Sequence, residues 1–277
     1  MASSAIPPLS IAIIACNEET TIARCIQSAA ELSPDQEVIV IDSGSTDSTR
    51  EIARGLGARV LHNKWTGHRN QKNVALGRCC HDWVLALDCD EEVSNELRNS
   101  IVDFFESGAD KQFVAASMNR KVWFMGRWIK HGDWYPDAKV RLFRRSQAHW
   151  GGSHEHDKVA HEGDAKHLAG DLHHFSFPDT NRYIEKISVF SDAYLKRELK
   201  KGRKWNFFRN TSRPIWRFFR AYVIRRGFLD GFPGFWIATA TAFQTFVRHS
   251  RTYEHENSAP PPELATRASS QLQSENI

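Results

Sequence analysis

Four carboxylates follow one short apolar segment of this chain. Residues 83–87 read Trp-Val-Leu-Ala-Leu, and Asp88, Asp90, Glu91 and Glu92 come directly after them. An apolar run of this length is typical of a buried strand, and ligands of open α/β sheets bind beyond the carboxyl ends of such strands. On an extended backbone Asp88 and Asp90 project to the same side, where their oxygens could share a hard divalent cation that carries a diphosphate.

A purely structural explanation of these acids is equally open at this point. Acidic side chains are favoured in the first turn of a helix, where they interact with the positive end of the helix dipole. Glu91 and Glu92 would then belong to the first turn of the next helix, and the cluster would have no ligand.

The elements that must position the acids alternate between strand and helix. Hydrophobic periodicity predicts strands at 9–15, 38–41, 59–62 and 83–87, with helices at 17–32, between Asp47 and Gly57, and at 71–78. Asn17 is expected to cap the first helix, and Gly57 to end the second. This β/α series predicts an α/β fold with a mostly parallel sheet flanked by helices.

Acids recur at three of the predicted strand ends. Glu18 follows the first strand, Asp42 the second, and Asp88 and Asp90 the fourth. The recurrence favours a nucleotide site at that edge of the sheet. Because neither GxGxxG nor GxxxxGK[ST] occurs, a metal is expected in place of a glycine-rich phosphate cradle.

Four segments in this order resemble a known family. IAIIACNEE, VIVIDSGSTDST, GHRNQKNVAL and DWVLALDCDE are similar to the nucleotide-sugar domain of family 2 glycosyltransferases, in particular the branch that builds the lipopolysaccharide inner core. The resemblance covers roughly the first hundred residues. It implies a GT-A fold, an inverting reaction, a UDP-sugar donor and Mg²⁺ or Mn²⁺ as cofactor.

The resemblance also implies residue roles. Glu18 and Asp42 would contact the uridine, Lys72 would approach the nucleotide, Asp88 would lie by the ribose and Asp90 would hold the metal. The sequence departs from the family at two positions, since Cys16 replaces the usual tyrosine and Cys89 is the middle residue of the DxD motif. Neither change removes an implied ligand.

Residues 119–145 combine aromatic and basic side chains and are not expected to be helical throughout. The aromatic residues could form a stacking platform for a sugar, and the arginines could bind donor phosphates as bidentate donors. The alternative is that the aromatics are core and the arginines a solvated strand edge. The segments GRWIKHGDWYP and RLFRR continue the family resemblance, which favours the functional interpretation. The candidate platform residues are Trp123, Trp128, Trp134 and Tyr135, and the candidate phosphate ligands are Arg141, Arg144 and Arg145.

The histidine-rich stretch that follows contains no HExxH pattern, so a closed zinc site is not expected. An inverting transfer needs one carboxylate that deprotonates the acceptor hydroxyl. Glu155 matches the glutamate of the family's His-Glu pair and is the candidate base, with Asp137 as the runner-up. His174 resembles the family's histidine beside the diphosphate or metal, although a core histidine is the alternative.

The chain carries its positive charge near its C-terminus. Residues 181–251 hold 16 Lys and Arg against 4 Asp and Glu, a net charge of +12, which leaves −8 for the remainder. Aromatic residues and arginines alternate through 205–226, a composition typical of a helix lying in an anionic membrane interface. A basic helix packed on its own domain is the alternative. Residues 227–247 are not expected to span a membrane, because Gly and Pro residues leave a helix of only about 21 Å from 234 to 247.

These observations predict three regions: a GT-A catalytic domain at 1–180, a helical membrane-interface arm at 181–251 and a disordered tail at 252–277. Five cysteines without CxxC spacing suggest neither disulfides nor zinc. The N-terminus has no basic segment and only a short apolar run, so it is not expected to act as a signal sequence. The expected protein is a hexosyltransferase acting on a lipid-linked saccharide, peripheral on the cytoplasmic face of the inner membrane, with no nucleic acid partner. A polyprenyl-phosphate glycosyltransferase and a non-catalytic nucleotide-sugar or polyanion-binding module are the alternatives.

Overall fold

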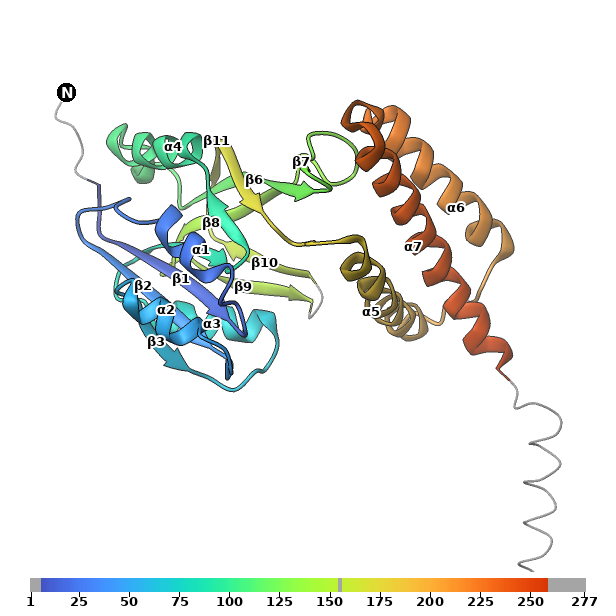
Figure 1. Cartoon of the computed structure of the whole chain (residues 1–277), viewed down its shortest axis with the longest axis horizontal. Helices are drawn as coiled ribbons and strands as arrows, with labels where there is room; N and C mark the ends of the chain where they lie inside the picture. Colours follow the sequence, from blue (N-terminus) through green and yellow to red (C-terminus); the bar gives the residue numbers. More distant parts are fainter. Residues whose placement is uncertain (1–5, 154–155, 259–277) are drawn as a thin grey trace, which may run out of the picture.

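The computed structural model describes residues 6–153 and 156–258. Figure 1 shows an α/β body and a helical arm, joined by an extended segment between β11 and α5. The strands are β1 (Leu9–Ala15), β2 (Gln36–Asp42), β3 (Arg59–His62), β4 (Trp83–Asp88), β5 (Glu91–Val93), β6 (Ala115–Phe124), β7 (Arg127–Trp128), β8 (Ala138–Arg144), β9 (Ala148–Ser153), β10 (His156–His161) and β11 (Ala165–His174).

The helices of the body are short, whereas those of the arm are long. The body contains α1 (Ile22–Ser28), α2 (Thr49–Gly55), α3 (His68–Arg78), α4 (Asn95–Glu106) and the 3₁₀ turn η1 (Ala109–Lys111). The arm contains α5 (Thr180–Lys200), α6 (Phe207–Phe219), the π-helical turn η2 (Arg220–Ile224), the 3₁₀ turn η3 (Gly227–Asp230) and α7 (Gly231–Asn257).

The main sheet has the order β3-β2-β1-β4-β8-β6-β11-β5, with β7 added to β6. The first four strands in this order are parallel, and β8 is antiparallel to both of its neighbours. The carboxyl ends of β1, β2 and β4 therefore lie at one edge. The mostly parallel α/β fold predicted from the sequence is confirmed.

Two hydrophobic cores cover the two faces of this sheet. Alternate residues of β1 point to opposite faces, so Ile11 and Ile13 pack with α1, α2 and α4, whereas Ala12 and Ile14 pack with α3 and the β9–β10 hairpin. Both faces are thus buried, which explains why β1 and β4 read as continuous apolar runs.

One local prediction and one open alternative, both concerning side chains near helix starts, are wrong. α1 begins at Ile22 with Thr21 as its N-cap, and Asn17 instead adopts a left-handed backbone conformation and accepts a hydrogen bond from the Thr46 N–H. Glu91 and Glu92 form β5, and Ser94 caps the following helix α4.

α7 is longer than the sequence predicted. It runs over 27 residues from Gly231 to Asn257, because Pro233 lies in its first turn, where a missing N–H breaks no helical hydrogen bond. The expected tail boundary at residue 252 is therefore wrong, and the remaining expected tail, 259–277, lies outside the described residues. None of the helices in the described part of the chain has the length and apolar content needed to cross a bilayer.

Candidate active site

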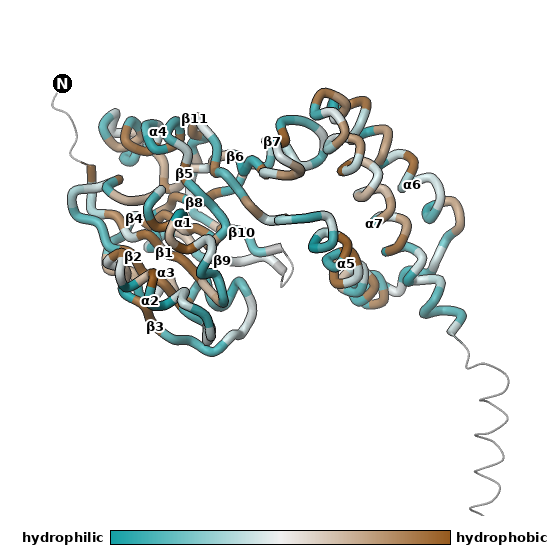
Figure 2. The backbone as a smooth tube through the Cα atoms, viewed as in Figure 1, coloured by the Kyte–Doolittle hydropathy of each residue, from teal (hydrophilic) through white to brown (hydrophobic). Residues whose placement is uncertain are grey.

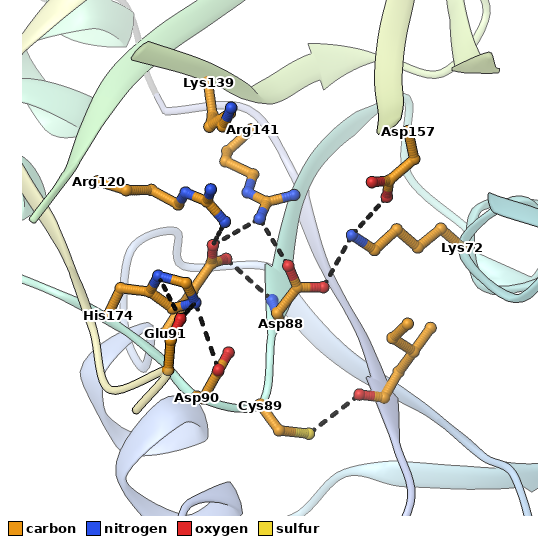
Figure 3. Close-up of polar contacts among 12 residues, drawn as sticks. Lys72, Asp88, Cys89, Asp90, Glu91, Arg120, Lys139, Arg141, Asp157 and His174 are labelled. Carbon is orange, nitrogen blue, oxygen red and sulfur yellow. Dashed lines mark hydrogen bonds and ion pairs between the residues drawn. The ribbon is translucent and has the colours of Figure 1, made fainter. Parts of the chain in front are cut away.

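The acidic cluster lies at the carboxyl edge of the parallel strands. Asp88 is the last residue of β4 and pairs in register with Ile14 of β1, while Asp90 lies in the turn before β5. Figure 3 shows how the side chains around them converge from several elements. The sheet register therefore brings Glu18, Asp42 and Asp88 to the edge that their strand-end positions predicted.

Asp42 is fully enclosed at this edge. Its side chain accepts hydrogen bonds from the backbone N–H of Gly44, at 2.9 Å, and of Ser45, and is also bonded to the Ser45 hydroxyl. Both carboxylate oxygens thus hold the loop after β2, so Asp42 orders the wall of the site with its side chain turned into the protein.

Asp88 is fixed by cations from two directions. Lys72 Nζ lies 2.8 Å from Asp88 Oδ1, and Arg141 Nη2 lies 2.7 Å from Oδ2. Burial acts to raise the pKa of Asp88, but the charges of Lys72 and Arg141 outweigh it and hold that pKa well below its ordinary value. Asp88 is therefore a permanent carboxylate with one preferred orientation.

Arg141 and Lys72 are consequently not free phosphate ligands. The buried Arg141 guanidinium also contacts Glu91, whose other oxygen accepts the Asp88 N–H at 2.9 Å. Lys72 Nζ lies 2.7 Å from Asp157 as well. The structure brings Lys72, Asp88 and Arg141 together, but joins them to each other.

Asp90 forms a separate pair with His174, the last residue of β11. His174 Nε2 lies 3.3 Å from Asp90 Oδ2, and the Ser176 hydroxyl lies 2.7 Å from the same nitrogen. Burial acts to raise the pKa of Asp90, but the hydrogen bond and charge of His174 lower it below its ordinary value. The structure thus brings together the two residues for which the family resemblance implies a place at the metal.

Asp90 and His174 both line a cavity of about 440 Å³. Glu18 shares it with Asp88 and Asp90; burial raises the pKa of Glu18, a hydrogen bond from Thr21 opposes this, and the charge of Asp90 adds to the increase. Asp157 also lines it, and four acids in one cavity favour a bound cation. The other lining residues are Ile14, Ala15, Cys16, Trp65, His68, Lys72, Cys89, His174, Ser176 and Lys186.

The residues present fit a divalent metal. Asp90 offers a hard oxygen donor and His174 an imidazole nitrogen in an acidic cavity, and such ions often take only one or two protein ligands, the rest coming from substrate phosphates and water. Within residues 6–153 and 156–258, no group of three or more His, Cys, Asp or Glu side chains is arranged to hold a metal ion.

A second cavity, of about 670 Å³, lies on the other side of Lys72 and Asp88. Arg120 and Lys139 line it, and both bind Asp137, at 2.7 Å and 2.8 Å. Burial acts to raise the pKa of Asp137, but the two cations outweigh it, so this pKa lies below its ordinary value. A carboxylate held in this way is a weakened base.

Arg144 lies away from both cavities. It is paired in register with Trp83, the first residue of β4, and so occupies the opposite end of the strand from Asp88. Its guanidinium contacts the carboxylate of Asp82 at 3.3 Å and the carbonyl of Asp110 at 3.0 Å. The structure does not bring Arg144 to the other predicted phosphate ligands.

The aromatic platform predicted at residues 123–135 is divided in the structure. Trp128 stacks on His173 with 4.1 Å between ring centroids, whereas Trp134 stacks on Phe177 and packs with Phe124 and Trp236 between the body and the arm. Trp134 is therefore partly buried against the hydrophobic cluster between body and arm, and Trp123, which is 37 % exposed, remains at the surface.

The candidate base Glu155 lies outside the described residues. Asp157, two positions later in β10, reaches Lys72 and both cavities and was missed by the sequence reasoning. The signal that could have found it was its position two residues after the candidate base in the sequence. Glu91 was also missed as a buried partner of Arg141, since sequence alone offered it a helix position.

Comparison with known proteins agrees with this geometry. Residues 10–162 match the sequence profile described as glycosyl transferase family 2. This chain belongs to that family. Over 256 residues it is 34 % identical to an uncharacterised glycosyltransferase of Rickettsia typhi, covering 89 % of this chain and 87 % of the relative.

Two further comparisons concern named proteins. The lipopolysaccharide core biosynthesis glycosyltransferase LpsC of Rhizobium meliloti is 26 % identical over 254 residues, which cover 89 % of this chain and 92 % of LpsC. Glucosyl-3-phosphoglycerate synthase of Mycobacterium tuberculosis, solved with Mn²⁺, UDP and glucosyl-3-phosphoglycerate, is 26 % identical over 42 % of this chain and 44 % of that chain, with a TM-score of 0.34. The family 2 assignment rests on the sequence profile and the full-length relatives.

Proposed function

We propose that this family 2 glycosyltransferase transfers a hexose from a UDP-sugar to a lipid-linked saccharide of the lipopolysaccharide core, using Mg²⁺ or Mn²⁺. The observation that carries this proposal is the cavity at the strand ends, in which Asp90 and His174 lie 3.3 Å apart beside Glu18 and Asp88. The similarity to LpsC along nearly the whole chain supports the acceptor class.

Different residues around the cavity would bind different groups of the UDP-sugar donor. Asp90 and His174 would hold the cation, which supplies charge neutralisation for the diphosphate leaving group. Asp88, fixed by Lys72 and Arg141, presents carboxylate oxygens in one orientation to the ribose hydroxyls. Asp42 holds the loop after β2 at the nucleotide end of the site.

The transfer itself is an inverting displacement. The acceptor hydroxyl oxygen forms a bond to the anomeric carbon, the bond from that carbon to the diphosphate oxygen breaks, and UDP leaves with the electron pair. A carboxylate takes the hydroxyl proton. Glu155 is proposed as this base, because the ion pairs of Asp137 with Arg120 and Lys139 lower the proton affinity of the alternative.

The arm supports a location at the cytoplasmic face of the inner membrane, where a lipid-linked acceptor would be met. Large apolar side chains on α6 recur at helical spacing and are exposed, with Phe208 76 %, Ile215 70 % and Trp216 56 % accessible. Figure 2 shows hydrophobic residues along all three arm helices. A monotopic contact requires such an apolar face.

Replacing Asp90 by asparagine tests the donor site. In calorimetric titrations with Mn²⁺ present, we expect Asp90→Asn to weaken UDP binding at least about tenfold, because a charged metal ligand is lost. Asp103→Asn, at an exposed position of α4, should bind UDP like the wild type. Equal UDP affinity of wild type and Asp90→Asn would reject the metal assignment.

The base is tested by paired substitutions. General base catalysis contributes roughly 10² to 10⁴ in rate, so Glu155→Gln should lower kcat by a factor in that range and leave UDP affinity unchanged. Asp137→Asn should retain most of kcat. A large loss in Asp137→Asn with an active Glu155→Gln would exchange the two roles. Transfer of radiolabelled hexose to purified lipopolysaccharide core is the measurement.

A further inference from the structure

The cavity of about 440 Å³ beside Asp90 and His174 is called the donor cavity below. One cationic side chain that lines it comes from the arm. Lys186 lies in the second turn of α5, and it lines the cavity that contains Glu18, Asp90, His174 and Ser176. The chain passes from His174 at the end of β11 to α5 through the short segment 175–179. The first helix of the arm therefore forms part of the wall of the donor cavity.

The surroundings of Lys186 differ from those of the other lysine in this cavity. Lys72 is held by Asp88 and Asp157 at 2.8 Å and 2.7 Å. Lys186 has no salt bridge within the described part of the chain, and its Nζ lies 4.6 Å from the ring centroid of Phe177. A cation–π contact fixes an ammonium group without neutralising its charge.

Burial lowers the pKa of Lys186, and the negative charges of Asp90 and Glu18 act in the opposite direction. A partly buried ammonium without an ion-pair partner has lost part of its hydration, and an anion bound in the cavity would compensate that loss. The donor cavity also presents an electrostatic difficulty, since the four carboxylates that line it repel a diphosphate and the charge of Lys72 is already shared by two of them.

We propose that Lys186 binds the diphosphate of the donor, so that the arm contributes a substrate-binding residue to the catalytic domain. This inference rests on the proposed use of a UDP-sugar. The ammonium donates to diphosphate oxygens in the Michaelis complex and stabilises the negative charge that accumulates on UDP as it leaves. Donor binding then also depends on the arm being docked against the body.

The test compares nucleotides that differ only in their phosphates. Uridine, UMP and UDP are titrated calorimetrically, with Mn²⁺ present, into wild type, Lys186→Gln, Lys186→Arg and Lys196→Gln. The last variant is the matched control, because Lys196 is an exposed lysine on the same helix. Circular dichroism melting of each variant establishes that the fold is intact.

We expect Lys186→Gln to weaken UDP binding about tenfold or more, since a charge-assisted hydrogen bond is lost, and to leave uridine binding unchanged. Lys186→Arg should recover most of the affinity, and Lys196→Gln should match the wild type. Equal UDP affinity of wild type and Lys186→Gln overturns the inference, as does an equal loss for uridine and UDP. Wild-type protein that binds no UDP at all would instead overturn the proposed function and this inference with it.

Discussion

The donor cavity and the junction between body and arm are built from the same residue types, but they use them differently. At the junction, the buried Asp133 lies 2.5 Å, 2.9 Å and 3.3 Å from Arg217, Arg220 and Arg225 of the arm. In the donor cavity, Glu18 and Asp90 face open space beside a few partners. Carboxylates neutralised by the protein hold structure together, whereas carboxylates left facing a cavity are available to a ligand.

In a second contact at the junction, the carboxylate belongs to the arm and its partners belong to the body. The arm residue Asp230 accepts hydrogen bonds from the backbone N–H groups of Lys130 and His131 of the body, at 2.9 Å and 2.7 Å. Each partner thus buries one carboxylate in the other. From the sequence, four arginines of the arm were expected to pair with membrane phosphates: Arg217, Arg220, Arg225 and Arg226. The first three are occupied by Asp133, and only Arg226 of this set has no salt bridge among the described residues.

The largest effect is expected when the junction carboxylate is neutralised. Asp133→Asn leaves three arginines without their counter-charge, and because their side chains stay partly solvated the free energy of unfolding should fall by about 2 to 3 kcal/mol, the lower end for a buried ion pair. Urea denaturation measures this value. Asp90→Asn should change it by no more than about 1 kcal/mol, and equal losses in the two variants would remove the distinction between junction and cavity.

Lowering the pH is expected to have an intermediate effect on the free energy of unfolding. The group responsible is His249, which is buried in the interior of the arm. Burial and then the charges of Arg213 and Arg209 lower the pKa of His249 to about 4, from an unfolded value of 6.5. The unfolded chain therefore binds more protons, so this stability is complete above pH 6.5 and is lost as the pH falls from 6.5 toward 4.

Between pH 7.5 and pH 5 we expect this histidine to contribute a loss of about 1 to 2 kcal/mol in the free energy of unfolding. Urea titrations at both pH values measure it. His249→Gln should be less stable at pH 7.5, because a hydrogen bond with Tyr194 is changed, but should lose less on acidification. The same pH dependence in wild type and variant would mean that other groups cause it.

The smallest stability change is expected at the apolar face of the arm. Ile215 and Trp216 are exposed, so changing both to serine should alter the free energy of unfolding by no more than about 0.5 kcal/mol. Flotation with anionic vesicles should nevertheless be lost, because the apolar contact is removed. Equal flotation of wild type and the double variant would contradict the membrane proposal. Arginine substitutions at the junction are unsuitable for this test, since they would undo the docking of the arm.

The sequence alone determined the features that depend on residues close together along the chain. The strand from Arg59 to His62 has the predicted bounds, and Gly57 follows the second helix with a positive φ of 81°. Strand periodicity also placed the acids correctly, because the parallel order of the strands forces their carboxyl ends to one edge. The family resemblance drew on these same local segments.

Only the tertiary structure decided which charges are available. Arg141 and Arg144 lie three residues apart on β8 and look equivalent in sequence, yet one contacts Asp88 and the other lies at the opposite end of β4. Asp133 and Arg217 meet across 84 positions of chain, a contact that no local pattern encodes. Lys186 belongs to a helix that reads as part of a separate region, but packing of the arm places it in the donor cavity. The reason is physical: periodicity fixes the face on which a side chain projects, whereas its partners are fixed by how the elements pack.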